Sequence, residues 1–226
     1  MAKILSIETS TDISSVCISE YGQILSVKES IHSMAHAKEG TLLIAACLKA
    51  ANLDFQQLDA VAISKGPGSY TALRVGSSIA KGICYAMDKP LIAVDTLASL
   101  ALAASTKLAA DFYCPMIDAR RKEVYMAFYN NKVAELQEVQ AKILDRDSFS
   151  MEIPTTETIL FCGNGSVKFQ EMTEQPNFLF LDLICSAKHL IPLAEKAFKN
   201  KQFESLAYFE PTYLKPPNIT VAKKKL

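Results

Sequence analysis

One unit of short strands and polar turns occurs twice in this chain, and it constrains the fold more than any other feature of the sequence. Each copy has three strands, and a polar turn joins the first strand to the second. The strands and turns lie at 4–7, 8–12, 15–20 and 24–27 in the first copy, and at 114–117, 118–122, 123–129 and from about 132 in the second. In both copies the first strand is followed by a carboxylate, Glu8 or Asp118. The recurrence predicts two related strand–turn–strand units.

A second element follows each unit in the same order. An apolar strand, Val61–Ser64 or Ile159–Cys162, runs into a turn of the form G-x-G-S. The turns are Gly66-Pro67-Gly68-Ser69 and Gly163-Asn164-Gly165-Ser166, and a segment that can be helical follows each of them. Two features in one order favour an internal duplication. The alternative is that α/β proteins commonly share strand–glycine–helix pieces.

The segments between these strands predict helices. They cover 38–51, 71–87, a stretch from Asp95 or Thr96 to about 110, and a stretch from Ser186 to about 199 that contains Pro192. Ser, Thr and Asp favour helix starts because their side chains accept hydrogen bonds from free backbone amides. We therefore expect an α/β fold with two lobes, residues 1–108 and 109–226. The C-terminal segment could belong to the second lobe or pack back on the first.

The glycine-rich turn before the helix at 71–87 has two interpretations. Glycines let backbone amides approach a ligand and a helix N-terminus favours anions, so the turn could cradle a phosphate. It lacks the spacing and the Lys-Ser/Thr ending of a Walker motif. The alternative is a tight turn that needs unusual backbone angles, followed by a helix cap. The residues of this candidate nucleotide site are Glu8, Thr9, Ser10, Gly66, Pro67, Gly68, Ser69 and Asp118.

Two neighbouring helices carry more apolar surface than one sheet can cover. Residues 42–48 are apolar around the whole helix, and the helix at 71–87 has a broad apolar face with Gly76 in it and Gly82 at its margin. A glycine inside a helix costs about 1 kcal/mol relative to Ala, and Gly76 permits close approach of another backbone. The cover could be the protein's own sheet or a second protein, and we favour a partner. The expected interface residues are Leu42, Leu43, Ala46, Cys47, Leu73, Gly76, Ile79, Ala80 and Ile83.

Charge and composition exclude several classes of protein. Lys+Arg and Asp+Glu number 24 each, whereas a protein that binds nucleic acid tightly by itself usually has a basic excess. No segment has the roughly 18 apolar residues of a membrane span, and no signal peptide is visible. The six cysteines are scattered and form no C-x-x-C pair, which indicates buried thiols in a reducing compartment. We expect a cytoplasmic protein.

No complete catalytic or metal-binding set can be assembled from the sequence. His32 and His36 have the spacing of a helical metal pair, but their segment has the pattern of a strand end and loop, and the Glu of a zincin motif is absent. Glu8, Asp12 and Asp118 could supply carboxylates for Mg²⁺ or for general-base chemistry. Carboxylates at strand ends also commonly satisfy turns. We expect neither catalytic residues nor a metal site.

Several segments together resemble the TsaB family, also called YeaZ, over residues 4 to about 215. The Gly-Pro-Gly-Ser segment is also similar to a loop of the catalytic paralogue TsaD. Its combination with the segment 117–125 and the short chain is what makes the resemblance specific. The segments that carry it are 4–11, 65–76, 94–97, 117–125 and 211–215.

The resemblance implies a duplicated actin-like fold of the sugar kinase/Hsp70/actin type and a role in tRNA threonylcarbamoyladenosine synthesis. It implies that TsaD transfers the threonylcarbamoyl group to adenosine 37 of tRNA, whereas TsaB-like chains are non-catalytic scaffolds or activators. They pair with TsaD, or with themselves, through the helices that correspond here to about 38–51 and 71–87. The ATPase TsaE and the adenylate-forming enzyme TsaC complete the set. The resemblance implies no cofactor beyond weak ATP or ADP binding at the interface with TsaD.

The chain departs from the family pattern at four positions. Glu8 stands where Asp is usual, Ala72 and Lys122 stand where Gly is common, and Lys215 replaces Arg. The longer side chain of Glu8 and the methyl group of Ala72 would crowd an ancestral phosphate site. Two alternative functions stay open, an ATP-binding phosphotransferase or ATPase of the same superfamily and a glycoprotease-like metallopeptidase.

Overall fold

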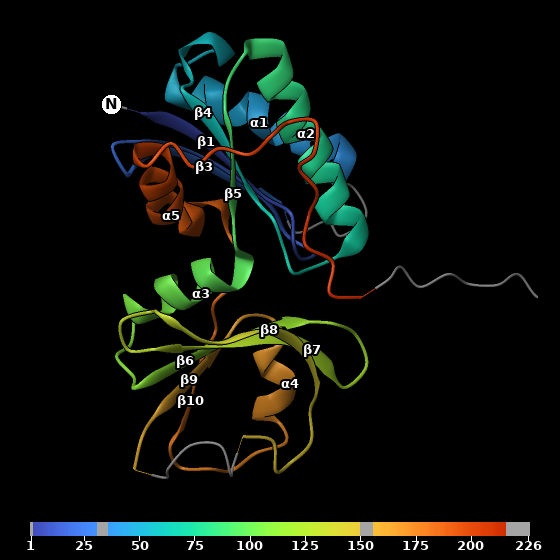
Figure 1. Cartoon of the computed structure of the whole chain (residues 1–226), viewed down its shortest axis with the longest axis vertical. Helices are drawn as coiled ribbons and strands as arrows, with labels where there is room; N and C mark the ends of the chain where they lie inside the picture. The colour runs from blue at the N-terminus through green and yellow to red at the C-terminus, as the bar shows by residue number, and fades with distance from the viewer. Residues whose placement is uncertain (1, 31–35, 150–155, 216–226) are drawn as a thin grey trace, which may run out of the picture.

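Two five-stranded sheets form the framework of the protein, one above the other in Figure 1. The computed structural model describes residues 2–30, 36–149 and 156–215. The strands of the first sheet are β1 (Lys3–Glu8), β2 (Ser14–Glu20), β3 (Gln23–Ser30), β4 (Ala60–Ser64) and β5 (Leu91–Val94). Those of the second are β6 (Phe112–Asp118), β7 (Glu123–Asn130), β8 (Glu135–Ile143), β9 (Ile159–Cys162) and β10 (Phe178–Leu181).

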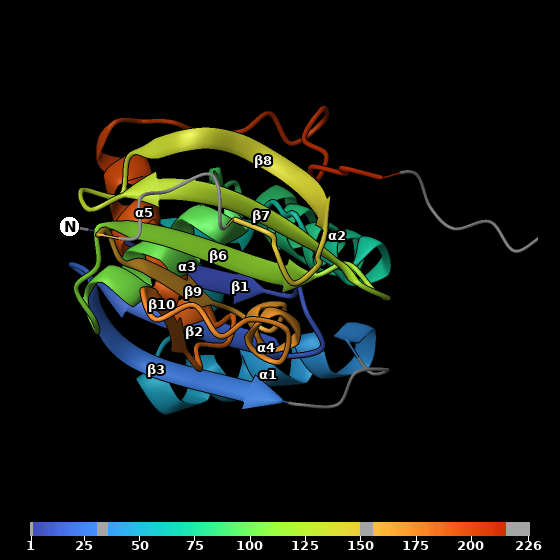
Figure 2. The same ribbon diagram turned by 90° about the horizontal axis from the view of Figure 1, so that it is seen from below.

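The two sheets have the same topology. The first has the order β3-β2-β1-β4-β5, and the second has the order β8-β7-β6-β9-β10, which Figure 2 shows from below. In each sheet the first three strands of the copy pair antiparallel and the last two join in parallel. The internal duplication predicted from the recurring strands and G-x-G-S turns is therefore confirmed. The strand pattern of the sequence predicts neither β5 nor β10, because each is a run of only four residues without alternation.

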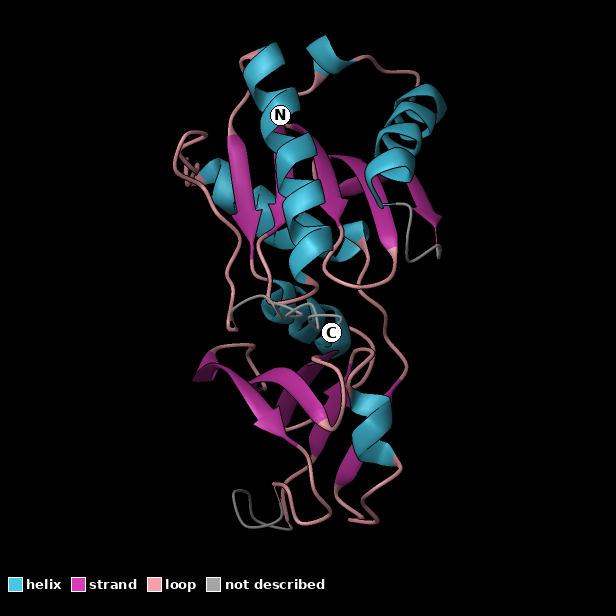
Figure 3. Cartoon of the chain, turned by 90° about the vertical axis from the view of Figure 1, so that its right-hand side faces the viewer, coloured by secondary structure: helices cyan, strands magenta, loops and turns pink. Residues whose placement is uncertain are grey.

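Helices lie between and around the two sheets (Figure 3). They are α1 (His36–Ala51), the short 3-10 turn η1 (Phe55–Gln57), α2 (Tyr70–Met87), α3 (Thr96–Ser105), α4 (Ser166–Gln170) and α5 (Ala187–Lys199). The four predicted helices are present. The cap of α3 is Asp95, whose Oδ1 accepts a hydrogen bond from the Ala98 amide at 2.9 Å. This helix ends at Ser105, earlier than predicted.

Two helices are exchanged between the lobes. α3 follows β5 of the first sheet but packs on β6 and β9 of the second, where Leu97 and Leu100 join the cluster that contains Leu160. α5 follows β10 of the second sheet but packs on β1, β4 and β5 of the first, where Leu190 joins the cluster of Ile4. The packed units therefore do not coincide with residues 1–108 and 109–226, since each sheet is covered by a helix from the other half of the chain.

The remaining face of each sheet is covered by elements of its own half. α1 and α2 cover the first sheet, with Ile44 and Leu48 of α1 in one cluster with Val16 and Ile18 of β2. Among the residues that the structure describes, the helix on this side of the second sheet is the five-residue α4. Phenylalanines fill the space that a longer helix would occupy, with ring centroids 5.0–5.8 Å apart among Phe128, Phe149, Phe161, Phe169 and Phe178.

The two glycines inside α2 have different surroundings. A Cβ atom at Gly76 would lie 2.3 Å from Oγ1 of Thr9, in the turn after β1, so the close approach there is to the protein's own first turn. A Cβ atom at Gly82 would meet no atom of the described residues within 4 Å.

We expect opposite effects from Ala at these two positions. Gly76→Ala overpacks a buried contact and should lower the free energy of unfolding by about 1–3 kcal/mol. Gly82→Ala removes a glycine from an exposed helical position and should raise the free energy of unfolding by about 0.5–1 kcal/mol. Urea denaturation of both variants measures this. Equal destabilisation by both would contradict the assignment of Gly82 to an open surface.

Candidate functional site

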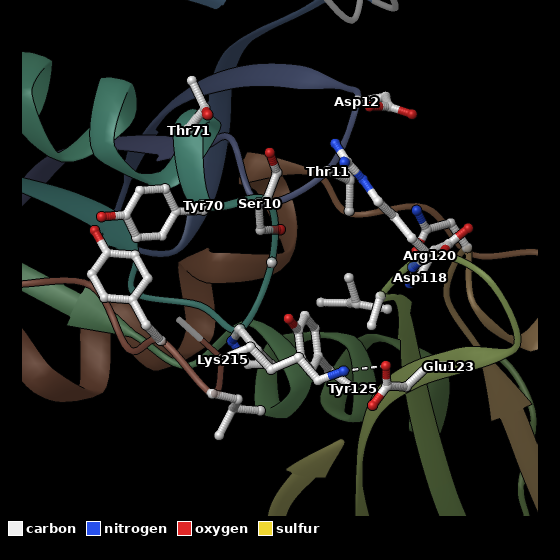
Figure 4. Close-up of a pocket in the computed structure, with 18 of the residues that line it drawn as sticks. Ser10, Thr11, Asp12, Tyr70, Thr71, Asp118, Arg120, Glu123, Tyr125 and Lys215 are labelled. Carbon is white, nitrogen blue, oxygen red and sulfur yellow. Dashed lines mark hydrogen bonds and ion pairs between the residues drawn. The ribbon is translucent and has the colours of Figure 1, made fainter. Parts of the chain in front are cut away.

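A cleft of about 680 Å³ lies between the lobes, where the turns after β1 and β6 face each other (Figure 4). The glycine loop and the first turn of α2 belong to the wall formed by the first lobe. The C-terminal segment also lines the cleft. The lining residues of the cleft are 10–12, 67–71, 117–121, Glu123, Tyr125, Asn164 and 212–215. Of the candidate nucleotide residues, Ser10, Pro67, Gly68, Ser69 and Asp118 line this cleft, whereas Glu8, Thr9 and Gly66 do not.

The carboxyl group of Glu8 is buried in the first lobe. Its Oε1 accepts hydrogen bonds from the Ser10 amide at 2.6 Å and from the Ser64 hydroxyl at 2.8 Å. Its Oε2 has no hydrogen-bond partner among the described residues. Burial raises the pKa of this carboxyl above its ordinary value, against the opposing effect of the hydrogen bonds. Glu8 is therefore placed to brace the turn after β1, and the expectation that it contributes to a nucleotide site in the cleft is wrong.

The glycine loop is closed against the turn after β1. A Cβ atom at Gly68 would lie 2.3 Å from the carbonyl oxygen of Ser10, and the amide of Ser69 donates to that oxygen at 2.7 Å. Gly66 has a φ of +105°, and a Cβ atom there would lie 2.8 Å from the carbonyl oxygen of Thr212. The glycines thus serve close backbone packing. The Ser69 amide, which a phosphate cradle would need, is already occupied.

Thr9 also has a structural contact. Its hydroxyl donates to the Ala72 carbonyl at 2.9 Å, which ties the turn after β1 to the start of α2. Thr9 is buried, so its place in the candidate nucleotide site is also wrong.

Asp118 is the one carboxylate of the candidate site that lies in the cleft. Its Oδ1 accepts a hydrogen bond from the Arg120 amide at 2.6 Å. The same oxygen forms an ion pair with Nζ of Lys168, also at 2.6 Å. Nζ of Lys168 also donates to the Arg121 carbonyl, and the Asp118 amide donates to the Asn164 side chain at 3.0 Å. Asp118 therefore stabilises the turn after β6 and is already neutralised by a lysine of α4.

The C-terminal segment bridges the two lobes across the cleft. The Thr212 amide donates to the Lys65 carbonyl at 2.7 Å, and Nε of Arg74 donates to the Tyr213 hydroxyl at 3.3 Å. The Tyr213 ring lies 4.6 Å from the Tyr70 ring, and Lys215 pairs with Glu123 of the second lobe. The sequence alone identifies 211–215 only as a terminal motif and does not predict its place at the cleft, because these contacts join segments more than 90 residues apart.

The structure divides the expected interface residues of α1 and α2 into three groups. Leu42 and Ala46 are exposed, and Leu43, Ile79 and Ile83 are half-buried. Cys47, Leu73, Gly76 and Ala80 are buried inside the chain, so the prediction that these four face a partner is wrong. Cys47 and Ala80 belong to the core between the helices and the sheet.

The prediction missed further exposed residues of the same helices. They include Tyr85 of α2, which is 85% exposed, and the small residues Ala45, Ser78, Gly82 and Ala86. The helical spacing of Gly82 and Tyr85 relative to the buried Ala80 and Cys84 is the signal that could have identified them.

No three His, Cys, Asp or Glu side chains in the described part of the chain lie together in a way that could hold a metal ion. His32 and the side chain of His36 lie outside what the structure describes. None of the described helices is both long enough and apolar enough to cross a membrane.

The six cysteines are all buried free thiols, as predicted. Burial raises the pKa of the Cys17 and Cys162 thiols to about 12, so that these groups stay protonated and unreactive.

Comparison with known proteins places the chain in a family. The profile of the family described as TsaD, tRNA N6-adenosine threonylcarbamoyltransferase, matches residues 21–223. The tRNA threonylcarbamoyladenosine biosynthesis protein TsaB of Buchnera aphidicola is 30% identical over 204 residues, which cover 88% of this chain and 90% of that protein. The chain belongs to the TsaB family. TsaB of Haemophilus influenzae is 28% identical over 221 residues, covering 94% and 93% of the two chains.

Solved structures support the TsaB assignment and the fold. YeaZ from Pseudomonas aeruginosa has a TM-score of 0.78 and 25% identity, over 95% of this chain and all of that chain. Component A of the (R)-2-hydroxyglutaryl-CoA dehydratase of Acidaminococcus fermentans has a TM-score of 0.50 and 10% identity, covering 89% of this chain and all of that one, so it shares the fold alone. The TsaB-family chain therefore has the expected duplicated, two-lobe actin-like fold.

Resemblance to the transferases themselves is partial. The tRNA N6-adenosine threonylcarbamoyltransferase of Bacillus thuringiensis is 36% identical over 111 residues, which cover 42% of this chain and 32% of that protein. The TsaB-family chain is thus a paralogue that shares one segment of moderate similarity with them.

Glu8→Gln tests the assignment of the buried carboxyl. Because folding raises the pKa of Glu8 above 4.5, the wild-type protein loses stability as the pH rises from that value through the folded pKa. The loss is at most about 1.4 kcal/mol per pH unit. Gln keeps an acceptor for the Ser10 amide and does not ionise. The stability of Glu8→Gln relative to wild type should therefore increase between about pH 4 and pH 8 in denaturant titrations.

Asp12→Asn is the control for this measurement, since Asp12 is an exposed carboxylate of the same turn. A stability difference for Glu8→Gln that does not change with pH would mean that Glu8 is ionised in the folded protein, and the assignment would fail.

Proposed function

We propose that this TsaB-family chain is a non-catalytic scaffold and activator subunit of tRNA threonylcarbamoyladenosine synthesis, and that it heterodimerises with TsaD. The observation that carries the proposal is the outer face of α1 and α2. An unpaired subunit should present an apolar surface that a partner can cover, and this face is the candidate.

The helix-pair face, which is the outer surface of α1 and α2, combines two large side chains with several small ones. Leu42 is 59% exposed and Tyr85 is 85% exposed. Exposed residues at helical spacing around them are Ala45, Ala46, Ser78, Gly82 and Ala86. Small residues permit close approach of a second helix, and exposed Leu and Tyr side chains can serve as anchors in its grooves.

The arrangement of the cleft supports an accessory role over a catalytic one. Glu8 is buried away from the cleft, Asp118 is paired with Lys168, and the glycine loop is packed on Ser10. No observation favours a phosphotransferase, an ATPase or a metallopeptidase. The site is best described as a vestige of nucleotide binding, and any weak binding of ATP or ADP is assigned to the interface with TsaD.

The proposal places the chain in a set of soluble partners. TsaD supplies the catalytic site, the ATPase TsaE acts on the pair, and a TsaC-type enzyme supplies the threonylcarbamoyl adenylate. The free chain can pair with itself through the helix-pair face, and TsaD then replaces the second copy. We assign the complex to the cytoplasm.

Ala46→Arg tests the helix-pair face. A bulky cation in the middle of this face should weaken pairing with TsaD by about 2 kcal/mol or more. Because Ala46 is exposed, the free energy of unfolding should change by no more than about 0.5 kcal/mol. Gel filtration with light scattering of the chain alone and with TsaD of the same organism measures the pairing.

Ala134→Arg is the matched control, since Ala134 is an exposed alanine of the second lobe. It should leave the 1:1 complex intact. No complex with the wild-type chain, together with ATP hydrolysis by the chain alone, would replace the scaffold proposal with a superfamily enzyme.

A further inference from the structure

The hairpin turn between β6 and β7 carries residue types that are unusual for its backbone conformation. Arg120 and Arg121 are successive residues of this turn, and their φ angles are +71° and +52°. The Ala119 amide donates to the Glu123 carbonyl at 3.0 Å across the turn. Two successive residues with positive φ favour Asn and Gly, because other side chains are strained there. The chain nevertheless places two arginines at this position.

The positive charges of this turn are not neutralised by its own carboxylates. Asp118 and Glu123 flank the turn, and each is paired with a lysine from another segment, Lys168 and Lys215. The side chains of Arg120, Arg121 and Lys122 are exposed, and none has a hydrogen bond or ion pair within the described ranges. Three cations therefore remain available at the edge of the cleft.

The arginine turn faces the first lobe across the cleft. Arg120 extends from the second-lobe turn toward the first-lobe turn that carries Thr11 and Asp12 (Figure 4). Asp12, an exposed carboxylate of that first-lobe turn, offsets only one of the three positive charges of the arginine turn, so the local charge stays positive. Thr71, an exposed residue of α2, supplies a hydroxyl group on the first-lobe wall.

An aromatic pair lies on the wall opposite the arginines. Tyr70, at the start of α2, and Tyr213, of the C-terminal segment, have ring centroids 4.6 Å apart, and both line the cleft. The guanidinium of Arg74 lies 4.6 Å from the centre of the Tyr70 ring. Aromatic rings beside cations are the groups that bind unpaired nucleic acid, through base stacking and phosphate contacts.

We propose that the arginine turn and the Tyr70–Tyr213 pair bind an unpaired segment of RNA, with phosphates on Arg120 and Arg121 and a base against the tyrosines. This rests on the proposed function, which brings a tRNA to the complex. A nucleoside triphosphate fits the cleft less well, because the glycine loop is packed on Ser10 and the Ser69 amide is occupied. The balanced net charge of the chain explains why such a site adds to the affinity of a complex and does not hold tRNA alone.

The test measures binding of a fluorescein-labelled tRNA anticodon stem-loop to the complex with TsaD, by anisotropy over a range of salt concentrations. Arg120→Ala/Arg121→Ala should weaken binding and reduce the slope of log K against log salt by about 2. Lys196→Ala/Lys199→Ala on the exposed side of α5 is the control with the same loss of charge, and it should keep the wild-type slope.

The aromatic wall is tested separately. Tyr213→Leu should weaken RNA binding by roughly tenfold, whereas Tyr213→Phe keeps the ring and should retain it. If Arg120→Ala/Arg121→Ala and the control Lys196→Ala/Lys199→Ala weaken RNA binding equally, the proposed site is overturned. If ATP or inorganic phosphate competes for Arg120 and Arg121 and abolishes RNA binding, the ligand of these arginines is a free phosphate and not an RNA strand. That result would also overturn the proposed site.

The two proposals can fail independently. Gel filtration shows whether Arg120→Ala/Arg121→Ala still forms the 1:1 complex, which it should, since the turn lies in the second lobe and the helix-pair face in the first. If wild type and TsaD form no complex, the proposed function fails. The same titrations on the chain alone at low salt then decide whether the arginine turn binds RNA.

Discussion

The structure depends on the exchange of two helices between its halves. Each five-stranded sheet has two apolar faces, and burying only one would leave the other in water at a cost of about 25 cal/mol for each Å² of apolar surface. α3 and α5 cover those second faces, and each comes from the half of the chain that forms the other sheet. The two helices also contact one another between the sheets. Neither lobe can therefore bury its sheet without the other, which fixes the lobes as one unit.

This exchange also determines where a cleft can form. With α3 and α5 placed between the sheets, the turns after β1 and β6 face each other at the carboxyl ends of corresponding strands. Here the backbone at Gly68 touches that of Ser10, and Glu8 is turned inward to Ser64. The cleft keeps its position, but the segment 212–215 joins its two walls, and Asp118 on the second-lobe wall is paired with Lys168 of the same lobe.

The duplication and most elements could be predicted from the sequence, because strand alternation, G-x-G-S turns and helix caps are local signals. The exchange of α3 and α5 could not, since a helix with apolar residues on several sides does not identify the sheet that it covers. The same limit explains the interface residues. A helix that is apolar all round must be covered on two sides, but the sequence does not say that Cys47 and Ala80 face the sheet while Ala46 faces outward. Likewise, Glu8 stands at the end of its strand whether it lines a nucleotide site or braces a turn. Only the packing of Ser64 and Ser10 turns its side chain inward.

The two proposed surfaces share one helix. Tyr70 and Arg74 lie in the first turns of α2 and contact Tyr213 at the cleft, whereas Gly82 and Tyr85 lie in its last turns on the helix-pair face. The C-terminal segment runs along the same helix, since Nζ of Lys81 donates to the Phe209 carbonyl before the chain reaches Thr212 and the cleft. A partner docked on the outer face of α2 would therefore lie beside this segment and near the cleft. An RNA held by the partner could then reach the arginine turn without either protein binding it tightly alone, because each contributes part of one continuous contact.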